Sequence, residues 1–241
     1  MIGLDAGVVL LQWATGGLLF LWVTGRRRVV GIGYGWLLRG VFGCLALGAA
    51  GLGEWAGLGV AGAAAVGLAV SVRGRKDGPA AFPAALDLVA TIVGVVALVA
   101  ITADDGALAL ARTLVGAGFL GAVSDAMLLG HWYLVQPGLG REPLHELNRW
   151  LALVWPFEVG LLLWPTGMLS VLSGSIDDGW NGMLGWFWVA CAITTLALTI
   201  VTRAALRERA YSAVMAATGL LYLAILTASG TDLVARALLA G

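Results

Sequence analysis

Apolar segments of close to twenty residues follow one another along almost the whole chain, separated by short polar gaps. A helix needs about 20 mostly apolar residues to cross the hydrocarbon core of a bilayer. The pattern predicts an all-α integral membrane protein, a bundle of about eight transmembrane helices in one domain over residues 1–241. The segments have the approximate bounds 6–24, 35–53, 55–72, 85–103, 107–135, 144–170, 181–202 and 210–234.

The composition supports a membrane protein over a soluble one. Hydrophobic residues make up 60% of the chain and charged residues 12%, against about 45–50% and about 25% in soluble domains. The net charge is +0, so the chain lacks the basic excess that a nucleic-acid partner requires. The expected partners are the lipid bilayer and other membrane subunits.

The basic residues predict the orientation in the membrane, because Lys and Arg concentrate in cytoplasmic loops. With eight segments, twelve of the fourteen basic residues fall on one side, and both termini lie on the outer side. In this arrangement the loops between segments alternate between the basic side and the other side. The alternation requires a turn at Glu54 between the second and third segments. All but one of the basic residues are arginine, which is typical of a high-GC bacterial genome and indicates a bacterial cytoplasmic membrane. The twelve are Arg26, Arg27, Arg28, Arg39, Arg73, Arg75, Lys76, Arg141, Arg149, Arg203, Arg207 and Arg209.

The two halves of the chain differ in composition. Residues 1–106 are mostly Gly, Ala, Val and Leu, and small residues allow membrane helices to approach closely. Residues 107–241 hold nearly all the polar residues within segments. The first half is therefore predicted to serve packing, and the second to carry the candidate site.

Ionisable residues near the ends of segments have a simple explanation. Arg39, Asp87 and Arg112 each lie within about a turn of a predicted helix end, where a side chain can extend to the interface. Asp232 lies near the outer end of the last segment and is predicted to be in contact with water. These four residues therefore need no functional role.

Asp125 and Glu158 lie deeper. An ionisable group inside a span is a functional hypothesis by default. Glu158 follows the helix-breaking Pro156, and a carboxylate beside such a break is expected to face a cavity or the bundle interior. Asp125 and Glu158 are the candidate catalytic, proton-transferring groups.

His131 and His145 are the only histidines in the chain. His131 lies in the last turns of the segment 107–135 and His145 in the first turn of 144–170. The link 136–143 is rich in Pro and Gly and must turn back. Both rings are therefore predicted to lie at similar depth near the cytoplasmic surface and to face one volume.

Two metal-containing sites fit this pair. Two neutral imidazoles from two helices are the ligand set of a b-type haem, in which case His131 and His145 would both bind iron. The pair could also hold a divalent metal with Asp125 or Glu146.

A quinone pocket is the third chemistry. A histidine would donate to one quinone carbonyl, Trp132 or Tyr133 would flank the ring, and Asp125 with Glu158 would pass protons, with histidine suited by an ordinary pKa near 6.5. Asp125 and His131 are separated by about 9 Å of helix rise and lie on neighbouring faces. That spacing fits a planar ligand better than a bare metal ion.

The leading hypothesis is a membrane subunit of an electron-transfer complex that binds quinone or haem b near the cytoplasmic face, with any enzymatic role belonging to an oxidoreductase complex. In helix number and in a polar site near one surface the chain resembles NrfD-type quinol-interacting membrane subunits, a resemblance that assigns no residue. The alternatives are a small proton-coupled transporter that uses Asp125 and Glu158, and a structural or assembly subunit. In the last case the histidines would be interfacial anchors.

Overall fold

The computed structural model describes residues 4–74, 84–165 and 167–239, and every regular element within them is a helix. The prediction of an all-helical bundle is confirmed. The elements are α1 (Ala6–Gly25), α2 (Ile32–Gly51), α3 (Gly57–Arg73), α4 (Ala84–Thr102), η2 (Ala103–Asp105), α5 (Ala107–Trp132), α6 (Glu142–Leu163), α7 (Met168–Leu172), α8 (Met183–Ala205) and α9 (Tyr211–Leu238).

Six helices of the described residues are long and apolar enough to cross a bilayer, and they indicate an integral membrane protein. They are α1, α2, α4 with η2, α5, α8 and α9. Helix α3 is apolar but has only 17 residues. Helix α6 has 22 residues but includes Glu142, Glu146, Arg149 and Glu158, which lower its hydropathy.

The predicted segment 144–170 is wrong at its end. Helix α6 stops at Leu163, and Trp164 is extended, with φ −120° and ψ 150°. Pro165 follows, and a proline disfavours the helical conformation of the residue before it. The separate short helix α7 begins at Met168. Pro156, in contrast, lies inside α6, which continues through it.

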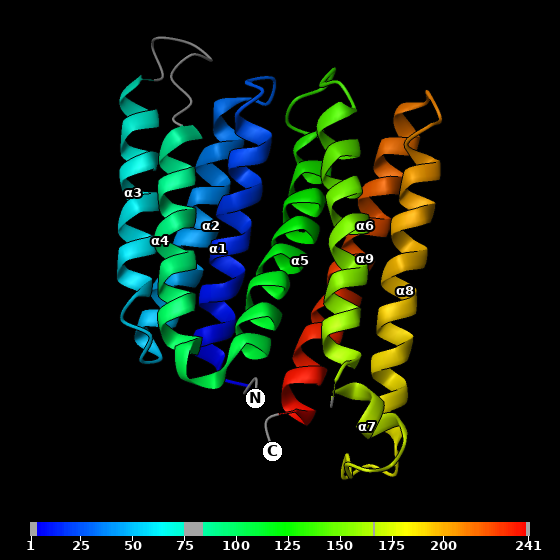
Figure 1. The fold of residues 1–241 in the computed structure, drawn as a ribbon. Helices are drawn as coiled ribbons and strands as arrows, with labels where there is room; N and C mark the ends of the chain where they lie inside the picture. The colour runs from blue at the N-terminus through cyan, green and yellow to red at the C-terminus, as the bar shows by residue number, and fades with distance from the viewer. Residues whose placement is uncertain (1–3, 75–83, 166, 240–241) are drawn as a thin grey trace.

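The helices form two four-membered bundles joined along one seam (Figure 1). In the first, α1 packs on α2 and α4, and α3 closes the ring between them. In the second, α5 packs on α6 and α9, and α8 closes the ring. The first long helix of each bundle, α1 or α5, lies at the seam. The two halves of the chain therefore repeat one arrangement of four helices. The first helix of each half, α1 or α5, runs in the same direction through the bundle.

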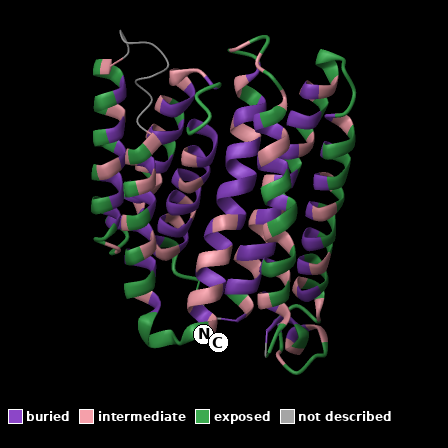
Figure 2. Ribbon diagram, turned by 45° about the horizontal axis from the view of Figure 1, so that its top comes forward, coloured by how far each residue is buried: buried purple, intermediate pink, exposed green. Residues whose placement is uncertain are grey.

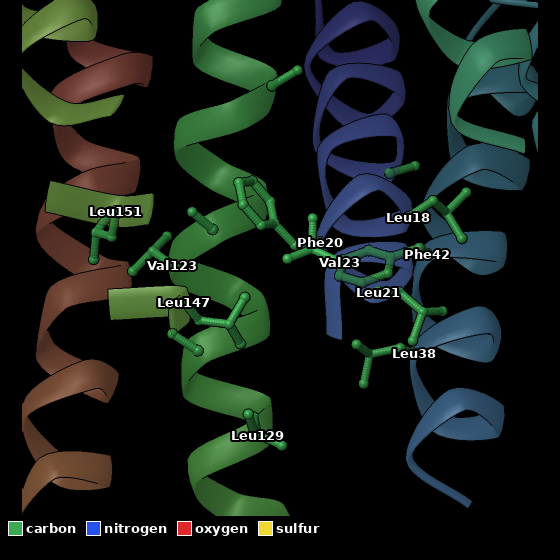
Figure 3. Packing of buried hydrophobic residues seen from close by; sticks show 14 of the residues in the cluster. Leu18, Phe20, Leu21, Val23, Leu38, Phe42, Val123, Leu129, Leu147 and Leu151 are labelled. Carbon is green, nitrogen blue, oxygen red and sulfur yellow. The ribbon is translucent and has the colours of Figure 1, made fainter. Parts of the chain in front are cut away.

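The core runs along the inner faces of both bundles (Figure 2). Leu18 and Phe20 of α1, Phe42 of α2 and Val123 of α5 belong to one continuous buried cluster (Figure 3). Large apolar side chains are also exposed on the outer faces, such as Leu226 at 68%. A continuous apolar exterior is what contact with lipid requires.

Small residues bring the seam helices into backbone contact. A side chain at Gly16 of α1 would overlap the backbone of Ala117, and one at Gly121 of α5 would overlap the backbone of Gly16. This close approach is the packing mode expected where lipid removes the apolar driving force between helices. The crossing lies near the middle of both helices.

The two ends of the bundle differ in charge. We call the end with the turns 26–31, 133–141 and 206–210 the basic end, and the end where the chain enters α1 and leaves α9 the terminal end (Figure 1). The turns at the terminal end contain Glu54, Asp104, Asp105, Asp177 and Asp178 and no arginine or lysine. Arg75 and Lys76 lie outside the described residues.

Side-chain bonds fix both ends. At the basic end Glu146 of α6 pairs with Arg26 at 3.0 Å and Arg27 at 2.8 Å, and Arg141 donates to the backbone carbonyls of Glu208, Arg209 and Ala210.

At the terminal end Asp178 organises the turn before α8. Burial alone would raise the pKa of the Asp178 carboxyl, but bonds from the N–H groups of Gly182, Trp180, Leu184 and Gly185 together hold it below its ordinary value.

Candidate functional site

Asp125 of α5 lies in the interior beside the seam. Its side chain is 0% exposed, and neither carboxyl oxygen accepts a hydrogen bond from the described residues. The Tyr34 hydroxyl lies close by but donates to the Asp125 backbone carbonyl at 3.2 Å. Asp87 of α4 is an acidic group that interacts with it. The carboxyl of Asp125 is therefore surrounded by protein, and no basic side chain among the described residues pairs with it.

A second polar group lies toward the terminal end, where α1, α5 and α9 meet. The Arg236 guanidinium donates to Asp232 at 2.9 Å and to the side-chain oxygen of Gln12, and Gln12 donates to Asp232 at 3.5 Å. Gly116 of α5 leaves space for this group, since a Cβ there would lie 3.0 Å from an Asp232 carboxyl oxygen. We call these residues, with Glu158 and Arg112, the terminal-end cluster.

Glu158 of α6 completes this cluster. Its side chain is 1% exposed, which confirms the prediction that it faces the bundle interior. Asp232, Arg236 and Arg112 are the charged groups that interact with it, but neither arginine donates a hydrogen bond to it. Arg112 instead donates to the carbonyl of Leu161 at 2.9 Å. Glu158 and Asp232 are thus two acidic groups of one buried cluster, and Asp232 is the one that Arg236 binds.

The first bundle holds a buried ion pair. Arg39 of α2 donates two bonds of 2.7 Å to the two carboxyl oxygens of Asp87 on α4. Both side chains are at most 1% exposed. Arg39 also donates to Ser71 of α3 at 3.4 Å, and Ser71 accepts a bond from Trp36. Three helices of the supposed packing half are joined by this group.

Four predictions about ionisable residues are wrong. Arg39, Asp87 and Arg112 do not extend to the interface, because Arg39 and Asp87 neutralise each other and Arg112 is bound by carbonyls at the end of α6. Asp232 is not in contact with water, being 1% exposed and paired with Arg236. Each of the four residues lies on the inner side of its helix.

The two histidines lie at the basic end but make separate contacts. His131 lies in the last turn of α5, where its ring meets Tyr222 of α9 edge-on, with a Tyr222 hydroxyl to Nδ1 distance of 3.5 Å. His145 lies in the first turn of α6 and is half-buried. In the described part of the chain, no hydrogen bond or ring contact joins the two imidazoles.

Trp132 and Tyr133 support the turn after α5. Trp132 donates to Gln136 at 3.1 Å, and its ring lies 6.0 Å from that of Tyr34. The hydroxyl of Tyr133 donates to the Gly140 carbonyl at 2.6 Å. The indole N–H of Trp132 and the hydroxyl of Tyr133 therefore both donate to partners within the protein.

The described residues do not gather metal-ligating side chains at any one place. Within residues 4–74, 84–165 and 167–239, no three His, Cys, Asp or Glu side chains form a group that could hold a metal ion. The suggested metal site of two histidines with Asp125 or Glu146 is therefore not assembled there. Glu146 is engaged by Arg26 and Arg27 instead.

The fold and the site define a class: an all-helical membrane protein of two repeated bundles, with charged groups inside each. No family model, curated protein or solved structure matches the chain. The functional argument therefore depends on the site itself.

Proposed function

We propose that the chain is a proton-coupled membrane carrier, in which Asp125 and Glu158 bind and release the coupling proton. The observation that carries this proposal is the carboxyl of Asp125, enclosed at the seam of two repeated bundles with no hydrogen-bond partner among the described residues. An ionised carboxylate in such surroundings is costly without a partner. Its ionisation must therefore be coupled to a cation or to a change of conformation.

The position of the acids supports the proposal. Asp125 lies nine residues beyond Gly116, which contacts the terminal-end cluster, so about 14 Å of α5 separates the two sites. The backbone contact between Gly16 and Gly121 lies between them. In transporters built from repeats, coupling sites lie near the repeat interface, and the halves move as bodies around it. By this fold-level analogy, movement at the seam would expose one acid site at a time.

Carbodiimide labelling tests whether these acids hold protons. Dicyclohexylcarbodiimide reacts with neutral carboxyls in apolar surroundings, so Asp125 and Glu158 are expected to be modified and labelling is expected to fall as the pH rises. Asp87 is the matched control, because it is equally buried but bound to Arg39. Mass spectrometry of peptides locates the label. Labelling of Asp87 alone would contradict the proposal.

Proton flux in liposomes tests the activity. With a membrane potential imposed and a pH-sensitive dye inside, Asp125→Asn and Glu158→Gln should each reduce protein-dependent proton entry about 100-fold, in the range of lost acid–base groups. Asp104→Asn, in an exposed turn, should behave like the unaltered protein. Equal flux in all four proteins would exclude the role assigned to these acids.

The proposed topology has eight spanning helices, α1 to α6 with α8 and α9, and both termini outside in a bacterial cytoplasmic membrane. The acidic turns at the terminal end and the arginines at the other support it. In a background with Cys44 and Cys191 replaced, Trp55→Cys and Ser175→Cys should react with an impermeant maleimide in intact cells. Val135→Cys should react only after the membrane is opened. An unreactive residue 55 would mean that α2 and α3 do not both cross.

Quinone binding is a second candidate function, and the His131–Tyr222 contact favours it. Both side chains are exposed on the outer face of the bundle, where a lipid-soluble quinone arrives. A quinone needs only one of the two histidines, and His131 with Tyr222 can serve it without His145. His131→Ala should weaken binding of decylubiquinone about tenfold, by loss of one hydrogen bond to a polar carbonyl, and His145→Ala should not. A reduced-minus-oxidised haem spectrum that either change abolishes would favour haem instead.

A further inference from the structure

Two pockets at the basic end flank Arg149 of α6, and they differ in charge. The first, of about 240 Å³, is lined by Arg27 and Arg149 together with Glu142 and Glu146, so its charges balance. The second, of about 280 Å³, lies between α6 and α8 and is lined by Arg149 and Arg203 with no carboxylate. The second pocket therefore has an excess of positive charge.

The two arginines of this second pocket are available to a ligand. Neither guanidinium makes a hydrogen bond or an ion pair within the described residues. Both side chains are exposed at the basic end, one from each wall of the pocket. Two guanidinium groups on facing helices suit a phosphate, which accepts several charge-assisted bonds.

Asn148 supports the wall between the two helices. It lines the pocket, is 2% exposed, and donates from Nδ2 to the Thr199 carbonyl at 3.1 Å, so it joins α6 to α8 beside the two arginines. Its Oδ1 is buried and accepts no hydrogen bond from the described residues. The groups that reach the pocket opening are therefore the two guanidiniums.

The rest of the pocket is apolar and faces outward. Ala152, Leu153 and Ile200 line it, and all three are exposed on the outer surface of the bundle. That surface is where the acyl chains of a membrane lipid would lie. A soluble anion would gain nothing from these side chains, whereas a lipid would cover them.

We propose that this pocket binds an anionic phospholipid from the leaflet at the basic end. Arg149 and Arg203 bind the phosphate. One acyl chain lies over Leu153 and Ile200. The inference does not depend on the proposed transport activity.

Native mass spectrometry of the intact protein in mixed micelles tests the site. Each basic residue near a membrane surface contributes about 1 kcal/mol, which corresponds to about fivefold in affinity. Arg149→Gln and Arg203→Gln should each weaken phosphatidylglycerol binding about fivefold, and the double variant about thirtyfold. Arg207→Gln is the matched control, because it removes an exposed arginine at the same end but outside the pocket.

Two further probes define the ligand. Phosphatidylcholine carries a phosphate but no net charge, so the unaltered protein should bind it more weakly than phosphatidylglycerol. The double arginine variant should lose that preference. Inorganic phosphate should not displace the lipid. Equal lipid binding by the double arginine variant and the control, or displacement by inorganic phosphate at matched concentration, would overturn the proposal.

Discussion

Replacing Asp87 by alanine is expected to lower the free energy of unfolding by about 3–5 kcal/mol, the range for a buried ion pair that loses one partner. The change leaves the Arg39 charge in the interior without its carboxylate, and both bonds of 2.7 Å are lost. Asp104→Ala removes an exposed carboxyl from a turn and should change stability by less than about 0.5 kcal/mol. Denaturant unfolding in micelles measures both.

A double variant separates charge from packing. Arg39→Met combined with Asp87→Leu replaces the ion pair by two apolar side chains, and such replacements are often neutral or stabilising. The double variant should therefore be clearly more stable than Asp87→Ala alone. If Asp87→Ala cost less than about 1 kcal/mol, the pair would not be the structural centre of the first bundle.

The sequence predicted the helices well because a helix that can cross a membrane is marked by a long apolar run. Seven of the eight expected segments end within a few residues of a helix in the structure, and the eighth was misjudged only after Leu163. The apolar run continues beyond that residue, but the helix ends before Pro165, since a proline disfavours the helical conformation of the residue before it. Pro156 lies inside α6 without ending it, so a proline in the sequence does not by itself give the boundary.

The sequence did not predict how each helix is rotated about its own axis, that is, which of its faces points into the bundle. In helices rich in Gly, Ala, Val and Leu, one face is hardly more polar than another, so the sequence does not show which side turns inward. The interfacial explanation of Arg39 and Asp87 assumed a lipid-facing rotation. Their pairing spans 48 residues of chain, and no local pattern reports it.

Part of the missed site did have a local signal. Asp232 and Arg236 are four residues apart on one helix, the spacing at which opposite charges meet. Two opposite charges at this spacing can neutralise each other, so the pair can be buried. Asp232 without Arg236 would be expected to lie in water. The partner Gln12 comes from the other end of the chain, and only the fold brings it to α9.

The seam between the bundles is expected to respond strongly to one added carbon. Gly121→Ala should lower the free energy of unfolding by about 1–3 kcal/mol, the usual cost of overpacking, because its Cβ would overlap the backbone of Gly16. Gly118→Ala, on the same helix, is the matched control. Its Cβ would meet Val154 at 3.7 Å, an ordinary contact, so the better helix propensity of alanine should raise stability by up to about 1 kcal/mol.

The opposite signs make the experiment decisive for the seam. If the two substitutions shifted the unfolding midpoint in micelles by the same amount and in the same direction, the close backbone contact would be excluded. Gly121→Ala also moves α1 away from α5, beside which the Asp125 carboxyl is enclosed. Water that enters there should decrease carbodiimide labelling of Asp125, while Gly118→Ala leaves it unchanged. Stability and proton binding at the seam would then depend on the same backbone contact.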